Sequence, residues 1–203
     1  MLYYLKVGGP LMWILFAMSI ISLTVILERT CFFCRRERFH NKNFSTDIIT
    51  AVASQDINCA IGLCERENNS VGCTVKKFLC RCDHNGDFHH FDQLVKEIGI
   101  DEIGSLEKRL HILGIIGYTA PMIGLLGTVT GMILAFQNMA SLGAGDPTVV
   151  ASGISQALVT TAGGLIIAIP TIIAYNLFNK KIEDTEGQID KITTNLINIL
   201  RKN

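Results

Sequence analysis

Polar side chains interrupt the last long apolar stretch of the chain, and their chemistry suits binding or relaying an ion. Gln156 and Thr160 are one helical turn apart, and Thr161 follows directly. A threonine hydroxyl can bond to the preceding turn of its own helix, but the glutamine amide does so less easily and needs another partner. Gln156 and Thr160 therefore predict a face that meets another helix or lines a water-filled pore. On an ideal helix Thr161 lies about 140° from Gln156, so the two need not share a face.

Small residues fill the preceding apolar stretch, which contains five glycines between residues 114 and 131. At about 100° per residue, one broad face collects Gly117, Pro121, Gly124, Thr128, Gly131 and Ala135. Small residues let helix backbones approach closely in lipid. We therefore predict helix packing at Gly117, Pro121, Gly124, Gly127 and Gly131. These residues alone leave open whether the same face also lines a pore.

The stretches that carry these residues are long enough to cross a membrane. The chain has 203 residues, of which 49% are hydrophobic and 18% charged, and its zero net charge gives no sign of nucleic-acid binding. No Asp, Glu, Lys or Arg occurs in residues 7–27, 112–145 or 147–179. About 20 apolar residues suffice to cross ~30 Å of hydrocarbon. We predict an all-α membrane protein with three transmembrane helices, extended by cytoplasmic helices.

The positions of the charged residues divide the chain into seven segments. These are an outer interfacial segment (1–9), transmembrane helix 1 (10–28), a cytoplasmic helical insert (29–111), transmembrane helix 2 (112–137), a short periplasmic loop (138–147), transmembrane helix 3 (148–179) and a cytoplasmic amphipathic helix (180–203). The first apolar run is long for a signal peptide and lacks a small-x-small cleavage site, so we expect a retained helix. Transmembrane helix 3 exceeds the bilayer thickness and must tilt, kink at Pro170 or protrude.

The distribution of basic residues predicts the orientation in the membrane. Seventeen of the eighteen Lys and Arg residues lie in residues 29–109 or after residue 179, and Lys6 is the exception. The positive-inside rule puts the N-terminus outside and the insert and C-terminus in the cytoplasm. The insert also holds all seven cysteines, and an odd number in a reducing compartment indicates free thiols.

Helices are the expected structure of the insert, because it contains no proline and its apolar residues have helical spacing. We expect one helix through Ile48 and Ile61, a second over 71–81, and a third from Phe88 that could run unbroken into transmembrane helix 2. After residue 181, a heptad seam consists of Ile182, Thr185, Ile189, Ile192, Leu196 and Ile199. This seam would pack either on the insert's own helices or on another subunit.

Two motifs of the chain resemble the MotA/TolQ/ExbB family. They are Ala120-Pro-Met-Ile-Gly-Leu-Leu-Gly-Thr-Val-Thr-Gly-Met132 and Ile154-Ser-Gln-Ala-Leu-Val-Thr-Thr-Ala-Gly-Gly-Leu165, the latter followed by Ala168-Ile-Pro170. The resemblance is specific over residues 110–180, and the three-span arrangement is more similar to ExbB or TolQ than to a MotA stator. The second motif adds Gly163, Gly164 and Pro170 to the residues predicted to pack helices.

The resemblance implies an inner-membrane ring, expected to be a pentamer, around the helices of an ExbD-like dimer. Proton flow through this complex would energise a TonB-like protein for transport across the outer membrane. Thr128 and Thr161 match threonines that line the family's inner cavity, and with Gln156 and Thr160 they form our predicted ion pathway. Gln156 stands where many members have glutamate. With glutamine at this position, residues 7–27, 112–137 and 148–179 contain no carboxylate, and a partner's transmembrane aspartate would carry the proton.

Other functions have less support in the sequence. Cys80, Cys82, His84, His89 and His90 include zinc-type ligands, but the paired spacing typical of zinc sites is missing, so we predict no metal site. No nucleophile–base pair or phosphate-binding glycine loop occurs near the membrane boundary, so we predict neither an enzyme nor a cofactor. The alternatives are a TolQ-like subunit for envelope maintenance and a membrane scaffold that does not conduct ions.

Overall fold

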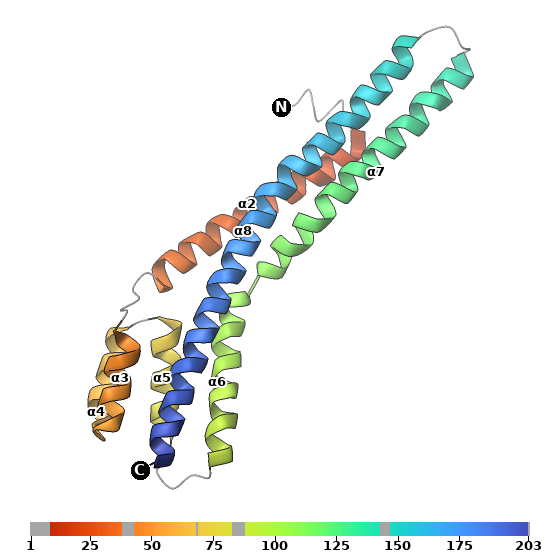
Figure 1. Ribbon diagram of the computed structural model, residues 1–203. Helices are drawn as coiled ribbons and strands as arrows, with labels where there is room; N and C mark the ends of the chain where they lie inside the picture. Colours follow the sequence, from red (N-terminus) through yellow and green to blue (C-terminus); the bar gives the residue numbers. More distant parts are fainter. Residues whose placement is uncertain (1–8, 38–42, 68, 83–87, 143–146, 203) are drawn as a thin grey trace. The chain divides into compact units, whose positions relative to one another are not determined.

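The computed structural model describes residues 9–37, 43–67, 69–82, 88–142 and 147–202, and these ranges contain seven helices and no strand (Figure 1). The helices are α2 (Gly9–Arg36), α3 (Phe44–Ala53), α4 (Ile57–Arg66), α5 (Ser70–Arg81), α6 (Phe88–Glu107), α7 (Leu110–Leu142) and α8 (Pro147–Lys202). Three of them, α2, α7 and α8, contain segments long and apolar enough to cross a membrane. The predicted all-α class with three spans is confirmed, and the number of copies in an assembly stays a prediction.

The chain forms two compact units. The span unit comprises residues 1–28 and 109–177, and the insert unit comprises residues 29–108 and 178–203. In the span unit, α7 and the first part of α8 form an antiparallel hairpin, on which α2 packs (Figure 1). Many large apolar side chains of this unit are exposed, among them Trp13, Leu126 and Ile166. Such exposure suits lipid or another protein as the surroundings.

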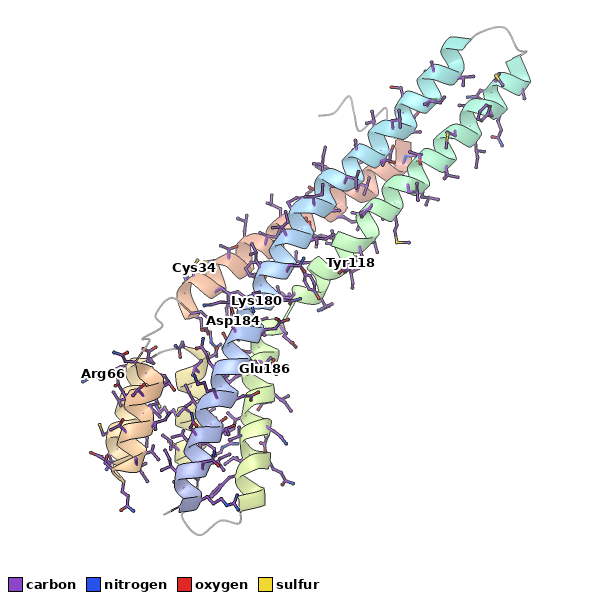
Figure 2. All side chains as sticks on the ribbon, viewed as in Figure 1. Cys34, Arg66, Tyr118, Lys180, Asp184 and Glu186 are labelled. Carbon is purple, nitrogen blue, oxygen red and sulfur yellow. The ribbon has the colours of Figure 1, made fainter. Side chains whose placement is uncertain are left out.

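Helices α3 to α6 and the last part of α8 share one apolar core in the insert unit. Phe78 and Ile48 are fully buried at its centre, and Ile189, Ile192 and Leu196 of α8 belong to the same cluster. The heptad seam of α8 therefore packs on the insert's own helices, which decides between the two alternatives. The exposed side of this part of α8 is charged. Lys180 and Asp184 lie there one turn apart, and Nζ of Lys180 forms an ion pair with Oδ1 of Asp184 at 2.9 Å (Figure 2).

Two helix breaks differ from the expected pattern. The predicted helix through Ile48 and Ile61 is two helices, because the chain turns at Gln55 with a φ of 60°. The helix beginning at Phe88 does not continue into transmembrane helix 2, since it ends at Glu107 and Arg109 has a φ of 68°. Left-handed backbone is uncommon outside glycine, and neither residue type signals a turn. The expectation of one helix through Ile48 and Ile61 was wrong, and of the two courses left open after Phe88 the structure has the interrupted one.

The helices also extend past the segment boundaries set by charge. Helix α2 continues to Arg36, α7 runs over residues 110–142, and α8 passes residue 179 without a break. A helix can leave the hydrocarbon and continue in water when its surface becomes amphipathic. The membrane boundaries themselves thus stay predictions.

Candidate functional site

Glycines of α7 lie directly against α8 along the hairpin of the span unit. A Cβ atom added at Gly131 would stand 2.9 Å from the Cβ of Ala157, and one added at Gly117 would stand 2.5 Å from Cγ1 of Ile172. In the other direction, a Cβ at Gly164 of α8 would come within 2.6 Å of the backbone oxygen of Ala120. Real Cβ atoms essentially never approach so closely, so the absence of side chains at these glycines lets the two backbones meet.

Two of the predicted pathway threonines lie in this tight contact. Thr160 is only 1% exposed, and its Cγ2 would be 2.4 Å from a Cβ at Gly127. Its hydroxyl donates to the backbone oxygen of Gln156 at 3.1 Å. Thr161 differs, because its hydroxyl donates across the hairpin to the backbone oxygen of Gly124 at 2.9 Å. Thr161 thereby joins α8 to α7.

Thr128 and Thr161 both border exposed apolar surface of the hairpin. Each is half-buried, and the hydroxyl of Thr128 donates to the backbone oxygen of Leu125 at 2.7 Å. One turn away, Leu125 is 62% exposed next to Thr128, and Leu158 is 61% exposed next to Thr161. The two hydroxyl-bearing residues therefore lie at the edge of a surface that the described residues of the span unit do not cover.

Gln156 faces a different neighbour, the beginning of α2. Its Nε2 atom would be 3.5 Å from a Cβ at Gly9, the first residue of that helix. Gly163, which is about 20° from Gln156 around α8, is similarly close to Met12. The structure thus packs the side chains of Thr160 and Thr161 against α7, whereas it places the side-chain amide of Gln156 next to the start of α2.

The two prolines of the predicted packing set lie inside helices. Pro121 is in α7 and Pro170 is in α8, and each helix continues through its proline. Proline has no N–H, so each removes one helical hydrogen bond and leaves the carbonyl four residues earlier without that partner. Pro121 is half-buried and Pro170 is exposed.

A buried ionic cluster in the insert unit was not predicted from the sequence. The carboxylate of Glu102, with a side chain only 7% exposed, lies 2.5 Å from Arg36 and 2.6 Å from Lys77. The thiol of Cys73 donates to the same carboxylate at 3.4 Å. Burial alone would raise the pKa of Glu102, but the hydrogen bonds from Lys77 and Cys73 and the two positive charges lower it overall.

The same cluster connects the end of α2 to α5 and α6. Next to Arg36, Glu37 accepts a hydrogen bond from the backbone N–H of Ser70 at the start of α5. Contacts of this kind join residues 25 to 66 positions apart in the chain. The sequence does not show which charged residues pair when they are so far apart in the chain. The one available signal for Glu102 was an acidic residue at a position within the apolar pattern of α6.

The cysteines of the insert do not form a metal site within the described residues. No group of three or more His, Cys, Asp or Glu side chains occurs there, and all seven cysteines are free thiols. His84 and the side chains of His89 and His90 lie outside the described residues. Cys64 is buried, and burial is the main reason that the pKa of its thiol is raised to about 12.

Comparisons with known proteins identify relatives of this chain. It is 47% identical over 76 residues to the biopolymer transport protein ExbB of Helicobacter pylori strain J99, which is 37% of this chain and 52% of that protein. It is 44% identical over 83 residues to the Tol-Pal system protein TolQ of Pseudomonas aeruginosa, which is 41% of this chain and 36% of that protein. The match to biopolymer transport protein exbB1 of Vibrio cholerae is 34% over 117 residues, or 55% of this chain and 51% of that protein.

The matched segments thus span about half the length, or less, of these relatives. The family comparison covers more of the chain, because the profile of the MotA/TolQ/ExbB proton channel family matches residues 68–191. The matched range includes the whole glycine-packed hairpin of α7 and α8, with Thr128, Thr160 and Thr161. From this match and the three apolar helices, the chain is a multi-pass membrane protein that belongs to the MotA/TolQ/ExbB proton channel family.

Proposed function

We propose that this chain is the ExbB-like subunit of a proton-driven motor in the bacterial inner membrane. Five copies would surround the transmembrane helices of an ExbD-like dimer, and proton flow would energise a TonB-like protein for transport across the outer membrane. The observation that carries this proposal is the position of Thr128 and Thr161 at the edge of exposed apolar surface on the α7–α8 hairpin. Neighbouring copies would bring these hydroxyls around one central space.

The proton-carrying acid in this proposal comes from the partner. Residues 112–145 and 147–179 contain no Asp, Glu, Lys or Arg, and Gln156 cannot titrate at physiological pH. The ring would contribute a polar track of hydroxyls, with Thr128 and Thr161 nearest the lumen. Moving one elementary charge across the membrane releases ~2.3 kcal/mol of free energy per 100 mV of membrane potential. Several protons would therefore have to cross to drive substantial mechanical work.

The proposed membrane arrangement follows the charge distribution. Residues 10–28, 112–137 and 148–179 would cross the inner membrane, with the N-terminus in the periplasm. The insert unit, which includes the C-terminal part of α8, would lie in the cytoplasm, since it holds all but two of the basic residues. Lipid would surround the exposed apolar side chains that face away from the ring.

A TolQ-like role in envelope maintenance is the second candidate, because curated relatives with comparable identity are named TolQ. A scaffold that does not conduct ions is a third possibility, and it requires no pathway. The family is one of channel subunits rather than enzymes, and we propose no enzymatic activity.

Proton flux in vesicles tests the proposal directly. The chain is reconstituted with and without an ExbD-like single-span protein that carries a transmembrane aspartate, and proton uptake is followed with a pH-sensitive dye under an imposed potential. Uptake that requires both proteins, and that Thr128→Val abolishes, is the expected result. Intact complexes that pass no protons at any potential would favour the scaffold. A neighbouring gene for a TonB or TolA relative would distinguish the two motor systems.

A further inference from the structure

Gln156 lies in the predicted third span, and its surroundings in the span unit do not match those of the pathway threonines. We propose that Gln156 is a positioning residue, which holds the first turn of α2 against α8, rather than a group of the ion pathway. This inference concerns contacts within one chain and does not depend on whether the chain conducts protons.

The first argument is the course of α2 along α8. Gly9 is next to Gln156, Met12 is next to Gly163, and Leu15 shares a buried cluster with Ala168. Moving forward along α2 means moving forward along α8, so the two helices run parallel. Gln156 therefore meets the N-terminal turn of α2, whereas the later contacts are apolar.

The second argument is the chemistry of that turn. The first N–H groups of a helix have no partner within the helix, and the positive end of the helix dipole lies there. Gly9 itself has a left-handed φ of 71°, and Pro10 brings no N–H. An amide offers an acceptor oxygen and two donors, which suits this turn in a membrane where unsatisfied backbone groups are costly.

The third argument is the face that Gln156 occupies. Thr161 lies about 140° from Gln156 around α8 and donates to α7. The exposed residues next to Thr161, Leu158 and Leu165, lie on the side away from the α2 contact. One face of α8 is thus covered by α2, and a different face borders the surface available to a partner.

The test measures how closely α2 approaches α8 in the full chain in membranes. Met12→Cys and Gly163→Cys are combined, cross-linked with a short bis-thiosulfonate reagent, and quantified by mass spectrometry, which separates this product from the seven native cysteines. A matched pair, Gly114→Cys with Tyr175→Cys, reports the α7–α8 contact, because the atoms nearest to a Cβ at Gly114 belong to the Tyr175 ring that the second substitution removes. Gln156→Leu keeps a similar size but removes the polar atoms, and Gln156→Glu restores acceptor oxygens at the positive end of α2.

We expect Gln156→Leu to lower cross-linking of the first pair at least fivefold and to leave the second pair within twofold of the parent. Gln156→Glu should retain the first cross-link, and so should Thr161→Val. Unchanged cross-linking of the first pair in Gln156→Leu would overturn the proposal. The proposal would also fail if Gln156→Glu lowered this cross-linking as much as Gln156→Leu does. A loss of both pairs would also overturn it, because the amide would then support the whole span unit.

Discussion

The hydroxyl of Thr161 donates to the backbone oxygen of Gly124 at 2.9 Å and so connects α8 to α7. We expect Thr161→Val to remove this hydrogen bond at a cost of about 0.6 kcal/mol, because the Gly124 carbonyl keeps its own helical partner. Thr161→Ser should keep both the bond and proton uptake. Thermal unfolding in detergent and dye-based proton uptake measure the two effects separately. Equal uptake by the valine and serine variants would remove Thr161 from the pathway.

Thr128 should behave differently from Thr161, since its hydroxyl donates within its own helix to Leu125. Thr128→Val should therefore leave the melting temperature within about 1 °C of the parent, as expected for a change of only a few tenths of a kcal/mol. Partner-dependent proton uptake should nevertheless fall below detection. Thr119→Val is a suitable control, because Thr119 is half-buried on α7, as Thr128 is, and also donates within its helix, at 2.7 Å. Similar losses in both variants would indicate a general effect of removing hydroxyls.

Gly164→Ala should strongly destabilise the span unit. The added Cβ would meet the backbone oxygen of Ala120 at 2.6 Å, and backbone cannot move aside as a side chain can. Overpacking of this kind costs about 1–3 kcal/mol. Gly99→Ala is the matched control, because no atom lies within 4 Å of its added Cβ. The control should gain up to about 1 kcal/mol from helix propensity, and thermal unfolding followed by circular dichroism compares the two.

Acid should destabilise the insert unit through Glu102. Its carboxyl has a lowered pKa in the folded chain, so its ion pairs contribute stability above the ordinary pKa of 4.5. That contribution is lost as the pH falls through the lowered folded-state pKa. Glu102→Gln should reduce the melting temperature at pH 7 and should flatten its dependence on pH between 5 and 3. A variant with the parent's pH profile would show that other carboxylates control acid unfolding.

Thiol labelling should separate two cysteines of the same helix, α4. Cys64 is buried, and its pKa of about 12 leaves almost no thiolate at neutral pH, whereas Cys59 is exposed. With a maleimide reagent at pH 7, we expect Cys59 to be modified and Cys64 to remain free until the chain is denatured. Mass spectrometry of the labelled peptides provides the measurement. Comparable rates at both positions would contradict the buried location of Cys64.

Much of the fold could be predicted because it depends on local patterns. The uncharged runs predicted three spans, and the spacing of small residues indicated where helices would approach closely. The breaks at Gln55 and Arg109 could not be predicted in this way, because both residues adopt left-handed backbone without a glycine or asparagine to signal it.

The sequence indicates which residue types make up the candidate site, but it does not show which neighbouring helix each side chain faces. Periodicity could separate Gln156 from Thr161 by an angle, yet it could not tell which of the two faces α2 would cover. That choice depends on how a helix from a distant part of the sequence packs, as Gly9 and Met12 do against α8. The cluster around Glu102 escaped prediction for the same reason.

The close approach of α7 and α8 limits how the channel can move. For α7 to slide along α8, Gly127 would have to pass the methyl group of Thr160, and Gly131 would have to pass Ala157. With backbone against backbone, no long flexible side chains are present at these points to absorb such a displacement. The two helices should therefore move together as one rigid hairpin, and any rearrangement of the span unit must take place at the edges of that hairpin.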